Sequence, residues 1–427
     1  MNVAILTMFS SLPTTYSLVN VVAEQLYMLL RSGMGVKVIV NGNFDDSEKF
    51  GIFLDERIEW VKIPNEINGC PIRLFDYKTI DEKLHDSFYE EAEFSAVAFE
   101  KALSGVDVCI LHDILYTGWN YVYNIALRIA QKNLSEVRFL AFSHSFPVYR
   151  PLNIPEGMSG RFSPMPNTLF VYPTASGIPA LARQYDVPEG QCRVVYNSIP
   201  LTGSLCREVQ ELHSRTDLIS PDVLMVYPGR LTLAKKFDKV AAFAGCMHKL
   251  TERTVKVVLC DFPSADIEPE VYKAAVRAIG KQCGLSGDNM IFTSDYGYPQ
   301  GFPRQGVLDL FTLSNLFVCP SLSETFALTA IEAASRGNFI VLNQAVPALN
   351  EIGTSINAYF MKWDAVNFGY QTSETYVPSE KAYYEKHAAE IYKLMREDRS
   401  LFAKTMTRAR YSSEWIWKNQ LEPLITG

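Results

Sequence analysis

The amino-acid sequence predicts an α/β protein of two successive domains, each a parallel sheet doubly wound by helices. At 427 residues the chain is too long for one ordinary hydrophobic core, and two domains of roughly 200 residues are expected. Its content of 48% hydrophobic and 20% charged residues is that of a globular protein. Short apolar runs alternate with amphipathic segments throughout, which is typical of buried parallel strands covered by helices. We therefore expect two Rossmann-like domains that face a ligand cleft.

The first domain is predicted over residues 1–202. Its candidate strands are short apolar runs at residues 3–7, 36–40, 108–111, 138–142, 168–172 and 193–196. Leu18, Val22 and Leu26 recur at helical spacing and predict a helix over residues 17–31. A second helix, with an acidic and solvated face, is predicted over residues 81–102.

The second domain is predicted over residues 222–404, after a polar linker at residues 203–221. Its candidate strands are residues 223–227, 255–259, 290–293, 316–319 and 339–342. The tail is predicted to be helical over residues 400–421, and Trp415 and Trp417 are available to anchor it. Ligands are expected at the carboxyl ends of the strands.

Charge and cysteine usage exclude some classes of partner and suggest a compartment. The formal net charge is −7, and residues 1–200 hold 22 acidic and 16 basic residues. An acidic first half is a poor match for DNA phosphates or anionic lipids, so nucleic acid is possible but disfavoured. The eight cysteines form no C-x-x-C pair, which favours free thiols in a reducing compartment. With neither a signal peptide nor a transmembrane segment in view, we expect a cytoplasmic protein.

One stretch of the second domain combines a strand end with two spaced carboxylates. A buried strand ends at Cys319, and a helix is predicted to begin near Thr325 and to close at Gly337. The free backbone N–H groups of a helix start suit a diphosphate. Glu324 and Glu332 are eight residues apart, which is about 12 Å along a helix. Spacing alone favours Glu324 as a helix-capping residue and Glu332 as a surface residue. The alternative is that the two carboxylates bind a sugar and a ribose at the two ends of a diphosphate.

A second stretch, Gly229-Arg230-Leu231 followed by Lys235, begins where another strand ends. Arg230 and Lys235, as two cations at a strand end, can bind a diphosphate between them. The alternative is that they are ordinary solvated surface charges. Either stretch alone is weakly specific. Together, in this order and spacing, they indicate a nucleotide-sugar site.

The two stretches resemble glycosyltransferase family 4, a family of retaining enzymes with the GT-B fold. The matching residues are Gly229, Arg230, Leu231, Lys235 and Asp238, the E-x7-E pair Glu324 and Glu332, the segment 194–198 and Glu351. The resemblance covers the second half of the chain well, and the first half only by the order of its elements. It implies that the C-terminal helix, about residues 405–427, crosses back to the first domain.

The resemblance also implies roles for individual residues. Arg230 and Lys235, next to Gly229, would bind the diphosphate of a UDP- or GDP-linked sugar and neutralise the leaving group. Glu324 would position the hydroxyl groups of the donor sugar. Glu332 would bind the ribose. The backbone amides of three consecutive residues would hold phosphate: Phe326, Ala327 and Leu328.

In the first domain the resemblance implies that His144, after a strand, lies beside the transferred sugar. His112 is a weaker candidate of the same kind. Tyr16 and Ser17 stand where the family usually has two glycines, and they are expected to line a narrow entrance for a polar acceptor. A second departure is Thr325 and Ala327 in place of the glycines of Glu-Gly-Phe-Gly. Both departures put side chains where backbone approaches ligand.

The function that the sequence predicts is retaining transfer of a sugar from a nucleoside diphosphate to an acceptor hydroxyl, on a saccharide or small molecule. Neither an Asp-x-Asp sequence nor a His/Asp/Glu cluster with metal-ligand spacing occurs, so neither a metal nor a cofactor is expected. The alternatives are a sugar-nucleotide epimerase, a phosphorylase, a phage-type glucosyltransferase acting on hydroxymethylated DNA bases, and a non-catalytic binding protein.

Overall fold

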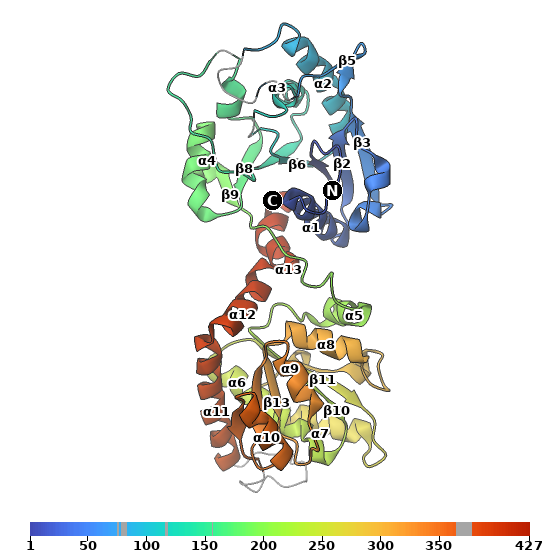
Figure 1. The fold of residues 1–427 in the computed structure, drawn as a ribbon, viewed down its shortest axis with the longest axis vertical. Helices are drawn as coiled ribbons and strands as arrows, with labels where there is room; N and C mark the ends of the chain where they lie inside the picture. The colour runs from blue at the N-terminus through green and yellow to red at the C-terminus, as the bar shows by residue number, and fades with distance from the viewer. Residues whose placement is uncertain (75–76, 78–82, 116–117, 156, 364–377) are drawn as a thin grey trace. The chain divides into compact units, whose positions relative to one another are not determined.

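The computed structural model describes residues 1–74, 77, 83–115, 118–155, 157–363 and 378–427. The chain divides into two compact units (Figure 1). The first comprises Met1–Ile199 and Ser413–Gly427, and the second comprises Pro200–Ser412. Each unit is built on one large parallel sheet, so the predicted class of two doubly wound α/β domains is confirmed.

The sheet of the first unit has seven parallel strands in the order β3-β2-β1-β6-β7-β8-β9. The strands are β1 Asn2–Leu6, β2 Gly35–Asn41, β3 Ile58–Ile63, β6 Val108–His112, β7 Arg138–Phe142, β8 Thr168–Tyr172 and β9 Cys192–Val194. A two-stranded hairpin, β4 (Glu66–Ile67) with β5 (Cys70–Pro71), stands apart from it. The strand order reverses between β1 and β6, where ligands bind in sheets of this kind.

Helices cover both faces of this sheet because β1 is apolar on both. Val3 and Ile5 belong to one buried cluster, and Ala4 and Leu6 belong to the other. Helix α1 (Ser17–Arg31) packs on the first cluster. The second cluster includes residues of α2 (Phe88–Leu103), α3 (Tyr121–Gln131) and α4 (Ile178–Tyr185).

The chain's last residues pack on the α1 side of the first unit. This segment consists of α13 (Ser413–Ile416), the π-helix Trp417–Leu421 and α14 (Glu422–Thr426). Ile416, Leu421 and Ile425 are fully buried in the cluster of α1, and Trp415 and Trp417 are partly buried against it. Ser413 Oγ donates to the Glu24 carboxylate on α1. The tail is thus part of the core of the first unit.

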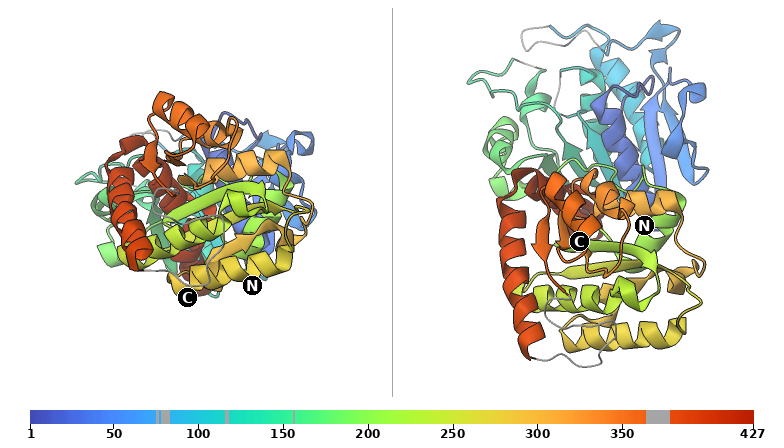
Figure 2. Two further views of the ribbon diagram at one scale, coloured as in Figure 1. Left: turned by 90° about the horizontal axis from the view of Figure 1, so that it is seen from below. Right: turned by 60° about the horizontal axis from the view of Figure 1, so that its bottom comes forward.

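The sheet of the second unit has six parallel strands in the order β12-β11-β10-β13-β14-β15. The strands are β10 Val223–Arg230, β11 Val255–Phe262, β12 Met290–Phe292, β13 Leu316–Cys319, β14 Phe339–Asn343 and β15 Tyr359–Met361. The helices are α5 Arg207–Thr216, α6 Phe237–Thr251, α7 Pro269–Gln282, α8 Arg304–Leu313, α9 Leu328–Ala334, α10 Pro347–Ser355, α11 Pro378–Glu397 and α12 Arg399–Tyr411. Helix α6 packs against α7 and α11, whereas α8 packs against α5 and α9 (Figure 2).

Several boundaries differ from the sequence-based expectation. Residues 203–221, expected as a linker, contain α5, whose Val209 and Leu212 are buried in the core of the second unit. The tail expected as one helix over residues 400–421 is interrupted at Ser412, and the chain passes from the second unit to the first there. The helix expected over residues 81–102 spans Phe88–Leu103, and residues 81 and 82 lie outside the described part.

All eight cysteines are free thiols, six of them buried, while Cys70 is exposed and Cys206 is half-buried. Within the described residues, every helix is too short or too polar to cross a lipid bilayer.

Candidate functional site

Strand β10 carries the Gly-Arg of the second unit at its carboxyl end. Gly229 and Arg230 pair with Asp261 and Phe262 at the end of β11. The Arg230 side chain is exposed, and it has neither a hydrogen bond nor an ion pair with any residue that the structure describes. Arg230 is therefore a cation available to a ligand at the carboxyl edge of the sheet.

Lys235 and Glu324 meet in an ion pair. Lys235 Nζ lies 2.5 Å from Glu324 Oε1, and the side chains are 25% and 15% exposed. Lys235 ends a 3₁₀ turn (Leu233–Lys235) that follows β10, and Glu324 lies in the loop that follows β13. Because β10 and β13 are neighbours in the sheet, their carboxyl ends bring the two loops together.

Two hydrogen bonds fix the loop of Lys235, and one of them joins it to the loop of Glu324. Leu322 N–H donates to the Ala234 carbonyl at 2.9 Å, and the Tyr227 hydroxyl donates to the Lys235 carbonyl at 2.8 Å. Burial raises the pKa of Tyr227 well above its ordinary value, so the hydroxyl keeps the proton that it donates. The position of Lys235 is therefore set by backbone contacts as well as by Glu324.

Helix α9 begins later than the sequence predicts. It spans Leu328–Ala334, and Ala327 precedes it with a left-handed backbone (φ 55°). Phe326 and Leu328 are 56% and 57% exposed, so their backbone lies at the surface of the unit. The backbone N–H groups expected to hold phosphate, those of residues 326–328, therefore lie just before α9 and at its first residue, where N–H groups have no partner within the helix.

Glu332, on α9, already has a cationic partner. Arg304 Nη2 lies 2.5 Å from Glu332 Oε1, where Glu332 is 14% exposed and Arg304 is 73% exposed. Sequence reasoning missed Arg304, because nothing in the sequence relates it to a residue 28 positions further on. A carboxylate has two oxygens and accepts several hydrogen bonds, so this contact leaves acceptor capacity for ribose hydroxyls.

Two other residues that match the family pattern, Asp238 and Glu351, differ in their burial. Asp238 is fully buried, 3.4 Å from both Lys239 Nζ and the Tyr272 hydroxyl. Lys239 in turn forms a 2.6 Å ion pair with Glu380, which joins α6 to α11. Glu351 is exposed on α10. Asp238 is therefore a buried partner of α6 and α7 residues in the core of the second unit.

In the first unit, two neighbouring strands bring together His112 and His144. His112 ends β6, and His144 follows β7. His112 Nδ1 lies 2.8 Å from His144 Nε2, and His112 Nε2 lies 2.9 Å from Gln25 Oε1 on α1. The backbone N–H of His144 donates to Asp113 Oδ1 at 2.9 Å. Asp113 has a left-handed backbone (φ 60°).

Burial sets the protonation of this cluster. It lowers the pKa of His144 to about 4, and it lowers that of His112 well below its ordinary value, with the charge of His144 adding to the effect. Burial raises the pKa of Asp113 to about 6, against the backbone hydrogen bond from His144. It also raises the pKa of Tyr16, and the charge of Asp113 adds to that shift. At neutral pH both imidazoles are neutral.

Tyr16 and Ser17 stand at the start of α1 and are exposed. The charge of Asp113 is the second cause of the raised pKa of Tyr16, after burial. The sequence analysis did not identify Asp113 as a candidate, although its place directly after a strand was a usable signal. It missed Gln25, which the sequence presents as one polar residue within a helix.

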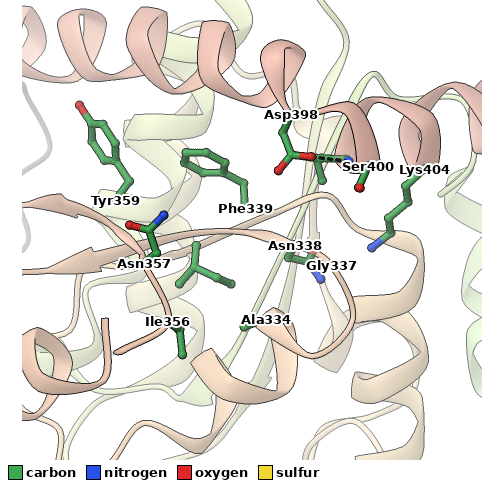
Figure 3. A pocket seen from close by; sticks show the side chains of 12 residues that line it. Ala334, Gly337, Asn338, Phe339, Ile356, Asn357, Tyr359, Asp398, Ser400 and Lys404 are labelled. Atoms are coloured by element: carbon green, nitrogen blue, oxygen red, sulfur yellow. Dashed lines mark hydrogen bonds between the residues drawn. The ribbon is translucent and has the colours of Figure 1, made fainter. Parts of the chain in front are cut away.

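A cavity of about 390 Å³ lies elsewhere in the second unit (Figure 3). Its lining includes Gly337, Asn338 and Phe339 at the amino end of β14, which is the opposite edge of the sheet from Glu324. Lys404 Nζ in its wall donates to the carbonyls of Arg336 and Phe311, at 2.7 and 3.3 Å. The cavity is therefore separate from the residues predicted to bind the donor.

Comparison with known proteins finds similarity among solved structures. No family model matches the chain, and no curated protein matches it. A glycosyltransferase from Rickettsia africae ESF-5 is 14% identical, with 99% of this chain and 97% of that chain covered and a TM-score of 0.35. Anabaena HepE in complex with UDP is 13% identical, with 99% of each chain covered and a TM-score of 0.33. Sucrose-phosphate synthase of Thermosynechococcus elongatus is 13% identical, with 99% and 98% covered and a TM-score of 0.34.

Proposed function

We propose that this protein is a retaining glycosyltransferase of the GT-B type. It transfers a sugar from a UDP- or GDP-linked donor to a hydroxyl group of a polar acceptor. The observation that carries the proposal is the Lys235–Glu324 ion pair at the carboxyl ends of β10 and β13, with Arg230, which pairs with no described residue, at the end of β10. Cations at that edge of a parallel sheet suit a diphosphate, and a carboxylate beside them suits sugar hydroxyls.

Each donor-binding residue has a chemical task in this proposal. Lys235 and Arg230 bind the diphosphate and stabilise the negative charge that it gains on leaving. Glu324 accepts hydrogen bonds from the sugar. Backbone amides before α9 hold a phosphate, and Glu332, paired with Arg304, accepts hydrogen bonds from the ribose.

The transfer step breaks the bond between the anomeric carbon and the diphosphate oxygen. A bond from the acceptor oxygen forms on the same face of the sugar, and the acceptor proton goes to the departing phosphate oxygen. The family resemblance favours this front-face route over a covalent intermediate, which needs a carboxylate nucleophile about 5 Å from a carboxylic acid. The residues of this chain supply charge stabilisation and exclusion of water, without a metal.

The acceptor is proposed to bind to the first unit near Tyr16, Ser17 and His144. Two hydroxyl groups, an imidazole and the nearby Asp113 carboxylate favour a ligand recognised by hydrogen bonds, a saccharide or small molecule. We also propose that the protein acts in the cytoplasm.

The test has two stages. Thermal melts with a panel of UDP- and GDP-sugars identify the donor, because a ligand at about 100 times its Kd stabilises by about 2.7 kcal/mol. Incubation with mono- and oligosaccharides then gives a product whose anomeric configuration NMR reports. We expect transfer with retention. Inversion would refute the mechanism, and an isomerised donor without transfer would show an epimerase. Transfer only to hydroxymethylated DNA, with binding that weakens steeply as salt rises, would refute the polar small acceptor.

A further inference from the structure

Three side chains of the first unit form a continuous hydrogen-bonded chain. Gln25, on α1, is 3% exposed, and its Oε1 lies 2.9 Å from His112 Nε2. His112 is also 3% exposed, and its Nδ1 lies 2.8 Å from His144 Nε2. The chain ends at His144 Nδ1, which makes no hydrogen bond with any residue that the structure describes.

The chemistry of these groups fixes where each proton lies. An amide oxygen only accepts, so His112 Nε2 carries a proton and donates it to Gln25. A neutral imidazole has one N–H, and therefore His112 Nδ1 holds a lone pair. Since Nδ1 accepts, the proton between the two rings belongs to His144 Nε2. His144 then holds a lone pair at Nδ1.

We infer that Gln25 is a positioning residue, which through His112 fixes the Nε2–H tautomer of His144 and leaves Nδ1 as a hydrogen-bond acceptor for a ligand hydroxyl. The inference deepens the proposed function and rests on it for the identity of the ligand, a sugar. The hydroxyl belongs either to the donor sugar or to the acceptor.

Two features of the first unit support this assignment. Burial keeps both imidazoles neutral at neutral pH, so each ring carries a single proton. Asp113 Oδ1 accepts the backbone N–H of His144 at 2.9 Å, which anchors that residue while its ring is held by His112. A ring fixed at both its backbone and its Nε2 presents Nδ1 in one direction, without a loss of ring freedom on binding.

The hydrogen bonds from Gln25 through His112 to His144 can also run in the opposite direction, and an experiment can distinguish the two directions. If the Gln25 amide were turned so that its NH2 group faced His112, every proton would shift by one site. His144 would then carry its proton on Nδ1 and would donate to the ligand. The two arrangements differ in the protonated nitrogen of both rings, and nitrogen NMR separates these tautomers.

The experiment measures two-bond nitrogen–proton spectra of 15N-histidine-labelled protein at pH 8. We expect His112 and His144 to show the Nε2–H pattern in the wild type. Gln25→Glu keeps an oxygen acceptor and is expected to preserve both patterns. Gln25→Leu removes it and should give mixed tautomers for both rings. The matched control is Gln131→Leu, which removes another buried glutamine side chain of the first unit and should change neither ring.

A ligand arm links the tautomer to the site. Addition of UDP-glucose, or of glucose alone, shifts the Nδ1 resonance of His144, and the ligand that causes the shift identifies the source of the hydroxyl. Gln25→Leu is expected to lower kcat/KM about tenfold, and Gln25→Glu about twofold at most, since one hydrogen bond is involved. An Nδ1–H pattern for His144 in the wild type would overturn the inference, as would unchanged tautomers in Gln25→Leu. The inference would also be overturned if neither bound nucleotide sugar nor bound saccharide acceptor shifted the Nδ1 resonance of His144. An enzyme without any transfer activity refutes the proposed function instead, because the free-protein spectra do not depend on turnover.

Discussion

Replacement of Lys235 by alanine tests the diphosphate site most directly. Lys235 Nζ is 2.5 Å from Glu324 Oε1, and the Lys235 side chain is 25% exposed. A diphosphate would bring a second anion to the same cation. Loss of the ammonium group therefore removes an attraction to the leaving group and leaves Glu324 without its cation, facing that anion.

The size of the effect follows from the distance and the surroundings. Two unit charges 4 Å apart attract by about 4 kcal/mol at an effective dielectric constant of about 20. Partial exposure of Lys235 reduces this to about 3 kcal/mol, which corresponds to a factor of more than a hundred in rate. We expect Lys235→Ala to lower kcat/KM at least a hundredfold, and mainly through kcat, because the charge on the leaving oxygen is greatest in the transition state.

The assay is initial-rate transfer from the donor that the thermal melts identify. Lys381→Ala is the matched control, because it removes a lysine of the second unit whose partner Glu385 lies 3.7 Å away on the surface of α11. This control should keep near-normal activity. Circular dichroism and a melting curve check that both variants fold. Near-normal turnover of a folded Lys235→Ala variant would refute the diphosphate assignment.

Three further predictions follow from the two sites. Arg230→Ala should also lower kcat/KM at least a hundredfold, with a melting temperature near that of the wild type because no described residue pairs with Arg230; near-normal turnover would contradict this. Glu332→Ala should weaken binding of donor and free nucleoside diphosphate alike, whereas Glu324→Ala should weaken only the donor, and equal losses of nucleotide affinity in calorimetry would argue against this division. The raised pKa of Asp113, about 6, makes its contribution to stability decline as pH rises from about 4 to 6, whereas the lowered pKa of His144, about 4, makes its contribution decline as pH falls from about 6.5 to 4. Asp113→Asn removes the first effect, so that only the effect of His144 remains. Urea melts between pH 4.5 and 6 should then show stability rising with pH more steeply than in the wild type. An unchanged slope would contradict the raised pKa of Asp113.

The strands that the sequence predicted include every central strand of the two sheets. A central parallel strand such as β1 must be apolar at every position, and the run Val3-Ala4-Ile5-Leu6 shows this directly. The missed strands of the two sheets, β3 and β15, each lie at one edge, whereas the strands at the opposite edges, β9 and β12, were predicted. In β3, Glu59 and Lys62 are exposed and interrupt the apolar run, and the apolar run of β15 is only three residues long.

The sequence predicts those residues of the candidate site that lie at the end of a strand. Strand ends are visible in the sequence, and Arg230 and His144 were placed by them. Contacts between elements were not predictable, because they depend on which strands and helices become neighbours. Arg304 reaches Glu332 through the packing of α8 against α9, and Gln25 reaches His112 through the packing of α1 on the sheet.

The left-handed backbone of Ala327 provides a last test, on the loop that is proposed to hold phosphate. A non-glycine residue in this conformation costs roughly 1–2 kcal/mol, and the family pattern has glycine at this position. Ala327→Gly relieves that strain, but it adds freedom to the unfolded chain, about 0.4–1 kcal/mol, and removes a buried methyl group, about 0.8 kcal/mol. These terms nearly cancel. Ala330→Gly is the matched control, because Ala330 is fully buried within α9 and its backbone is not left-handed. Ala330→Gly also adds freedom to the unfolded chain and removes a buried methyl group, but it relieves no strain. It should therefore lower the free energy of unfolding by about 1–2 kcal/mol more than Ala327→Gly does. Urea denaturation measures this difference. Equal destabilisation by the two substitutions would show that Ala327 is not strained.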